Sequence, residues 1–183
     1  SLQRGLAAAD SVFTFLDEPE EDDGGKAVLD AGTGDIEFSG VYYRYPEAEH
    51  NSLNGIDLTV PQGKVVALVG ASGCGKTTLA NMLPRFFDPT GGAVRIGGEN
   101  IRNYTLESLR GRIALVSQDV VLFSGTIAQN IAYGRSGDAS EDEIIRAAQA
   151  ANAWNFIQAM PQGLQTEIGE NGLKLSGGQR QRI

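Results

Sequence analysis

Residues 70–77, Gly-Ala-Ser-Gly-Cys-Gly-Lys-Thr, decide the fold class of this chain. They fit the pattern G-x-x-x-x-G-K-[ST], in which glycines let the backbone curl around an anion. Successive N–H groups then point inward at the positive end of the following helix. Lys76 is expected to reach the β- and γ-phosphates of a nucleotide and the Thr77 hydroxyl to hold Mg²⁺, with Thr78 in support. The stretch therefore predicts a phosphate-binding loop.

The sequence on both sides of this loop alternates strand and helix patterns. Residues 65–69 and 113–116 are short apolar runs, typical of strands buried on both faces. A helical pattern follows the loop over residues 76–86. Apolar residues alternate over 36–45, 56–60 and 93–96, as in strands with one buried face. We expect an α/β core with an antiparallel β edge, beginning near Gly34.

Helices are predicted toward the C-terminus. Ser140 and Glu143 have the spacing of a capping box, which starts a helix that runs to about Ala151. Apolar residues over 154–160 indicate one more short helix. This part of the chain is therefore expected to be helical.

Composition excludes several function classes. The chain has 183 residues, 41% of them hydrophobic, as expected of a folded domain. Its formal net charge of −8 argues against a nucleic-acid partner, which requires a basic face. Cys74 is the single cysteine and His50 the single histidine, so an internal disulfide and a two-histidine metal site are excluded. We interpret Cys74 as a small filler in the loop, since a reactive thiol needs a lowered pKa.

The N-terminal stretch has a different character. Apolar residues recur at spacings of three and four over residues 1–18, which predicts a helix that ends at Pro19. Acidic residues and glycines follow over 20–25 and indicate a solvated linker. The helix either packs on the main domain or is the tail of an element upstream. Because the chain begins at Ser1 without Met, we interpret it as a fragment.

A second motif, Leu-Ser-Gly-Gly-Gln, occupies residues 175–179. Ser176 is a typical helix N-cap, and the glycines behind it expose backbone N–H groups at the positive end of a helix. Alone it could be an ordinary capped turn. Together with the first loop, it predicts two anion-binding sites in one chain.

The two motifs together resemble the nucleotide-binding domain of ATP-binding-cassette (ABC) transporters. Residues 70–78 match the Walker A loop, 175–179 the signature sequence and 116–118 the Q-loop. Tyr45 resembles the A-loop residue that stacks on adenine, although Tyr42 and Tyr43 lie close and the ring could instead pack on the sheet. The resemblance implies binding of ATP and Mg²⁺. It implies catalytic roles for Lys76 and Gln118, and metal contacts for Thr77 and Gln118. The implied nucleotide contacts are Tyr45, Gly70, Ser72, Gly73, Cys74, Gly75, Lys76, Thr77, Thr78, Ser176, Gly177, Gly178 and Gln179.

The resemblance also implies an architecture and a cellular setting. The expected fold is an α/β P-loop NTPase core with an antiparallel β edge and the start of a helical subdomain, incomplete at its C-terminus. Residues 1–18 resemble the cytoplasmic end of a last transmembrane helix, 19–33 an acidic linker and 34–183 the ABC ATPase domain. Segments 119–131 and 166–172 resemble exporters, in particular the bacterial lipid A export half-transporters.

From this likeness we expect ATP-powered export of a lipid or hydrophobic substrate at the cytoplasmic face of the bacterial inner membrane. The implied partners are a second ABC ATPase domain, as a homodimer, and the transmembrane domain of the same chain.

Three other interpretations compete with this one. Soluble cassette ATPases of the DNA-repair or chromosome-structure type carry long coiled-coil insertions, and no heptad run lies between the two motifs here. A regulatory nucleotide-binding module without catalysis also fits the 183 residues. A simple phosphate-binding kinase is disfavoured by the signature sequence.

The 183 residues do not contain the Walker B Asp, catalytic Glu, D-loop or switch His of the family, and His50 precedes the loop. We expect this chain alone to be weakly folded and not to turn over ATP, because groups that position the attacking water and the metal supply much of phosphoryl transfer. Phosphate release by the purified chain tests this expectation. Sustained hydrolysis that Lys76→Ala abolishes would contradict it.

Overall fold

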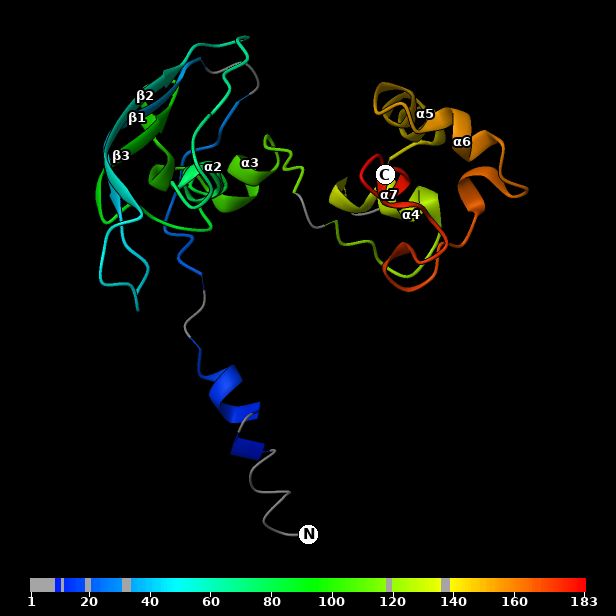
Figure 1. The fold of residues 1–183 in the computed structure, drawn as a ribbon, viewed down its shortest axis with the longest axis horizontal. Helices are drawn as coiled ribbons and strands as arrows, with labels where there is room; N and C mark the ends of the chain where they lie inside the picture. Colours follow the sequence, from blue (N-terminus) through cyan, green and yellow to red (C-terminus); the bar gives the residue numbers. More distant parts are fainter. Residues whose placement is uncertain (1–8, 11, 19–20, 31–33, 118–119, 136–138) are drawn as a thin grey trace. The chain divides into compact units, whose positions relative to one another are not determined.

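The computed structural model describes residues 9–183 except 11, 19–20, 31–33, 118–119 and 136–138. The chain divides into two compact units, Ser1–Ile113 and Ala114–Ile183, here called unit 1 and unit 2 (Figure 1). We describe each unit by itself. Within the described ranges, no helix has both the length and the apolar character needed to cross a membrane.

An antiparallel sheet is the framework of unit 1 (Figure 1). Its strands are β1 (Ile36–Tyr43), β2 (Leu53–Val60), β3 (Gly91–Ile96) and β4 (Glu99–Asn100), in the order β2-β1-β3-β4. Phe38 of β1 lies opposite both Leu58 and Val94, so its face of the sheet is fixed on both sides. The register shifts after Phe38, where Gly40 has φ 53°, as in a β-bulge. The predicted antiparallel β edge is confirmed.

Short helices complete unit 1. They are α2 (Lys76–Asn81), the 3₁₀ turn η1 (Ile101–Asn103) and α3 (Leu106–Arg110). The Thr105 side chain caps α3 by accepting a hydrogen bond from the Ser108 N–H. The apolar core joins one face of the sheet to these helices and comprises Leu29, Phe38, Val41, Tyr43, Leu53, Leu79, Met82, Val94, Ile96, Ile101, Tyr104 and Leu109. This core supports the loop that precedes α2.

Two predicted buried strands do not form. Residues 65–69 and 113–116 have no strand structure. Val65 is 99% exposed and Val69 89% exposed, and Val116 is exposed as well. Apolar composition alone does not make a strand, because each strand requires a hydrogen-bonded neighbour. None of the described strands pairs with either segment, so the prediction of two strands buried on both faces is wrong for this structure.

The predicted helix over residues 76–86 is also too long. α2 ends at Asn81, and turns continue to Arg85. Pro84 explains the early end, because it lacks an N–H group and its ring collides with the preceding helical turn. Arg85 then adopts φ 56°, a left-handed conformation that turns the chain back toward β3.

The N-terminal helix is present at residues 9–10 and 12–16, while residues 1–8 lie outside the described part. Its apolar side chains face solvent: Phe13 is 63% and Phe15 79% exposed. These side chains therefore do not pack into the core of unit 1, and the assignment of residues 1–18, 19–33 and 34–183 to three regions stays a prediction.

Residues 21–30 of unit 1, here called the acidic strap, are bonded to α3 and to the core of the unit, although most of them are exposed. Arg110 binds the Glu21 carboxylate with two N–H groups, one of them 2.7 Å from Oε2. Asp23 accepts the Leu106 N–H at 2.7 Å, at the start of α3. Leu29 belongs to the core and is 4% exposed. The core therefore begins before Gly34, and the acidic side chains Glu21 and Asp23 of the predicted linker, although exposed, are hydrogen-bonded to α3.

Unit 2 is helical, as predicted. Its helices are α4 (Ile127–Ile131), α5 (Glu141–Ala150), α6 (Trp154–Gln158) and α7 (Gly177–Arg180), with 3₁₀ turns η2 (Tyr133–Arg135), η3 (Gly163–Gln165) and η4 (Glu170–Gly172). The predicted capping box is confirmed, since Ser140 and Glu143 exchange side-chain-to-backbone hydrogen bonds at the start of α5. The core of unit 2 comprises Leu122, Ile127, Ala132, Ile144, Ala148, Ala153, Ile157, Leu164, Ile168 and Leu175.

The strap is expected to respond to acid. The hydrogen bonds from Arg110 lower the pKa of Glu21 below its ordinary value. The carboxylate therefore holds the strap fully above the ordinary pKa of glutamate, and the contact is lost as the pH falls through the lowered pKa. Hydrogen–deuterium exchange of residues 21–30, corrected for the intrinsic rate, should show this loss. Glu21→Gln should weaken protection at neutral pH and flatten its pH dependence, and an unchanged profile would contradict the prediction.

Candidate functional site

The phosphate-binding loop is built on left-handed glycines at the start of α2. Gly73 has φ 80° and Gly75 has φ 91°, values that only glycine adopts at little cost. Helical bonding begins directly afterwards, with the Leu79 N–H bound to the Gly75 carbonyl at 2.9 Å. The loop itself is tightened by a bond from the Cys74 N–H to the Ala71 carbonyl. The structure therefore has the left-handed glycine turn and the helix start that suit the motif.

Close approach also restricts Gly75, through backbone, and Gly70, through the Cys74 side chain. A Cβ on Gly75 would lie 2.7 Å from the Ser52 carbonyl oxygen, which is backbone just ahead of β2. A Cβ on Gly70 would lie 2.6 Å from the Cys74 Sγ. In contrast, a Cβ on Gly73 would meet no atom within 4 Å. Packing against the sheet thus restricts position 75, while position 73 is restricted by conformation alone.

Lys76 folds back over the loop. Its Nζ donates to the Gly70 carbonyl at 3.0 Å and to the Ala71 carbonyl at 2.8 Å, and it lies 3.5 Å from the Sγ of Cys74. These neutral partners hold the ammonium group at the mouth of the loop without neutralising its charge. An anion with several negative oxygens can therefore replace them, because charge-assisted hydrogen bonds are the stronger ones.

The two threonines after Lys76 differ in their surroundings. Thr77 is exposed on the first turn of α2, whereas Thr78 is 7% exposed. Magnesium at nucleotide sites takes one or two protein oxygens and completes its shell with phosphate and water. An exposed Thr77 hydroxyl beside the loop fits that donor set. The predicted second metal contact, Gln118, lies outside the described residues.

Tyr45 lies beside the phosphate loop. Its hydroxyl is 3.0 Å from the Thr78 Oγ1. The ring meets Tyr43 at 4.9 Å and Phe87 at 5.3 Å between centroids, edge to face in both cases, and the residue remains 36% exposed. Burial raises the pKa of Tyr43, so this neighbour stays neutral. No sequence pattern indicates the contact between Phe87 and Tyr45, because it depends on the turn after α2.

The signature motif has the predicted N-cap. Ser176 Oγ accepts the Gln179 N–H at 3.3 Å, and Gln179 Oε1 accepts the Ser176 N–H at 2.9 Å, so the two residues form a capping box at the start of α7. Gly177 and Gly178 are exposed, and a Cβ on either would meet no atom within 4 Å. Their backbone is therefore open to a ligand or to another chain. The motif belongs to unit 2, whereas the phosphate loop and Tyr45 belong to unit 1.

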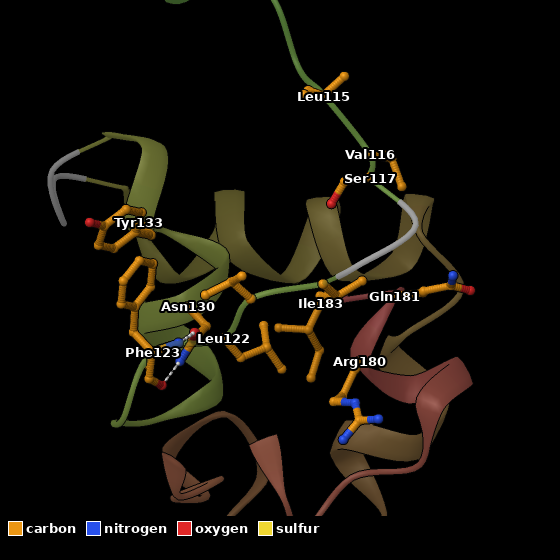
Figure 2. Close-up of a pocket in the computed structure, with 12 residues that line it drawn as sticks. Leu115, Val116, Ser117, Leu122, Phe123, Asn130, Tyr133, Arg180, Gln181 and Ile183 are labelled. Carbon is orange, nitrogen blue, oxygen red and sulfur yellow. Dashed lines mark hydrogen bonds between the residues drawn. The ribbon is translucent and has the colours of Figure 1, made fainter. Parts of the chain in front are cut away.

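A cavity of about 260 Å³ lies in unit 2 next to the Q-loop segment (Figure 2). Ser117 and Val120, which flank the residues that are not described, both line it. The rings of Phe123 and Tyr133 stack at 4.2 Å beside it, and Asn130 holds the Phe123 backbone through both its amide and its carbonyl group. The cavity thus combines an apolar lining with a rigid aromatic wall.

The features described so far are those of a P-loop nucleotide-binding protein with a signature helix. The chain belongs to the ABC transporter family, whose family model, described as "ABC transporter", matches residues 53–183. Over its full length it is 55% identical to the ATP-dependent lipid A-core flippase of Chromobacterium violaceum and 57% identical to that of Dechloromonas aromatica, and it covers 31% of each. The corresponding protein of Salmonella typhimurium is 51% identical, with 31% of it covered.

A solved structure, that of a bacterial Atm1-family ABC exporter with ATP bound, matches 98% of this chain with a TM-score of 0.85 and 41% identity. The match covers 32% of that exporter chain. The chain therefore has the mixed α/β ABC ATPase fold, and it spans about a third of the length of the relatives that it matches.

Two glycine substitutions should distinguish the effect of left-handed backbone conformation on stability from the effect of the close contact with Ser52. Gly73→Ala adds only left-handed strain, roughly 1–2 kcal/mol, whereas Gly75→Ala adds strain and a collision with the Ser52 carbonyl. We expect Gly75→Ala to lower the unfolding temperature of the purified protein, without nucleotide, clearly more than Gly73→Ala. Equal losses would show that the contact with Ser52 does not constrain the loop.

Proposed function

We propose that this chain is the ATP-binding part of a bacterial half-transporter that uses ATP hydrolysis to export a lipid or other hydrophobic substrate. The observation that carries the proposal is the phosphate loop, whose Lys76 ammonium group is held by two loop carbonyls, in a chain that also holds an exposed signature helix. Identity of 51–57% with lipid A-core flippases over the whole chain supports the lipid substrate.

The residues of unit 1 bind the nucleotide in this proposal. Lys76 exchanges the Gly70 and Ala71 carbonyls for β- and γ-phosphate oxygens, and the backbone N–H groups of residues 70–77 surround the phosphates. Thr77 holds Mg²⁺ and Thr78 supports the phosphates. The exposed part of the Tyr45 ring stacks on adenine. Gln118 contacts the metal or the attacking water.

A second copy of the domain supplies the rest of the site. Two domains pair head to tail, so that ATP on Walker A of one faces residues 176–179 of the other. The capping box fixes the Ser176 hydroxyl oxygen, and the open backbone of Gly177 and Gly178 lets N–H groups approach the γ-phosphate. ATP then favours the closed dimer through its higher affinity for that state, and hydrolysis releases it.

The transmembrane domain of the same protein is the other proposed partner. Residues 1–18 continue from its last helix, and the chain lies at the cytoplasmic face of the inner membrane. The cavity beside Ser117 and Val120 supports this arrangement, because it gives the Q-loop segment an apolar neighbour on which a membrane-domain segment can press. Motion of the membrane-domain segment is transmitted to Gln118 through Ser117 and Val120.

Ser176→Arg tests the proposal in the full-length protein. Arginine removes the cap and fills the exposed approach to Gly177, so we expect unchanged ATP binding at Walker A and at least a tenfold loss of ATP-dependent dimer closure, measured by cross-linking or by distance spectroscopy.

Ser140→Arg is the matched control, since it removes the equivalent capping box of α5 in the same unit. It should leave closure intact. ATP-dependent closure that persists in Ser176→Arg would refute the proposed role of the signature.

A further inference from the structure

The hydroxyl groups of Tyr45 and Thr78 bridge two elements that are distant in the sequence. Tyr45 lies two residues beyond the end of β1, and Thr78 is the third residue of α2. Their oxygen atoms are 3.0 Å apart. Thr78 is 7% exposed and Tyr45 36% exposed, so this bond is partly shielded from water.

Three groups fix the position of the Tyr45 ring. Tyr43 and Phe87 meet it edge to face, at interplanar angles of 83° and 80°. Edge-to-face pairing is a preferred aromatic geometry, so these two contacts hold the faces of the ring. The bond to Thr78 is the directional contact of the three, and it anchors the hydroxyl end of the ring and so the direction of its long axis.

Each hydroxyl has one proton and two acceptor lone pairs, so either of the two can donate this bond. Thr78 follows Lys76 and Thr77 on the first turn of α2. The bond therefore ties the Tyr45 ring to the helix that begins at the phosphate loop.

We propose that Thr78 is a positioning residue for the Tyr45 ring, through which the phosphate loop controls recognition of the nucleotide base. The inference rests on the proposed ATP site but goes beyond it. It states that the affinity gained from the base depends on a hydroxyl group in the phosphate loop. A free tyrosine ring, without this bond, keeps its apolar contact with a base but loses its fixed orientation.

The test compares two probes, ATP and inorganic tripolyphosphate, with the full-length protein. The ratio of their affinities measures the contribution of the base. Tyr45→Phe keeps the ring and removes its hydroxyl, and Thr78→Val keeps the shape and removes the partner. One neutral hydrogen bond corresponds to about a threefold to tenfold change in affinity. We expect each variant to lower the ratio by that factor, and the double variant to lower it no further.

Two further variants make the result specific. Thr78→Ser keeps the hydroxyl and should retain the ratio of the unmodified protein. Tyr42→Phe removes a hydroxyl from an exposed tyrosine on β1 and should change nothing. Additive losses in the double variant, or an unchanged ratio in Tyr45→Phe, would overturn the positioning role. Equal affinity of the unmodified protein for both probes would instead refute the proposed adenine site, which separates the two failures.

Discussion

The approach of Gly75 to the Ser52 carbonyl is the contact on which the nucleotide loop depends. It allows α2 to start directly against the strand β2, and it places Lys76 over the loop carbonyls rather than out in solvent. The same helix start brings Thr78 beneath Tyr45. The start of α2, which needs glycine at position 75, therefore carries the Lys76 ammonium group, the Thr77 hydroxyl and the Thr78 contact to the Tyr45 ring.

Features that depend on neighbouring residues could be predicted from the sequence. The capping boxes at Ser140 and Ser176, the alternating strands of the antiparallel sheet and the left-handed glycines of the loop all follow from local patterns. The Pro84 that ends α2 is also a local feature, and its effect could have been read from the sequence. Local chemistry thus accounts for the shape of the candidate site.

Features that depend on distant partners could not be predicted. Residues 65–69 have the composition of a buried strand, yet a strand exists only where another strand pairs with it. Glu21 and Arg110 are 89 positions apart, and Tyr45 and Thr78 are 33 positions apart. No periodicity in the sequence connects such pairs. The contact between Tyr45 and Phe87 requires both the end of β1 and the turn after α2, which is why sequence patterns left the role of the ring open.

The contacts of the strap determine the order in which segments of unit 1 bear a pulling force. Tension applied from the N-terminal side of the chain reaches residues 21–30 before it reaches β1, an interior strand of the sheet. The buried Leu29 side chain and the backbone bonds from Lys26 and Ala27 to Asn103 take up that load first. We therefore expect the strap to detach from unit 1 before tension reaches β1. The phosphate-binding loop keeps its conformation until the strap has detached.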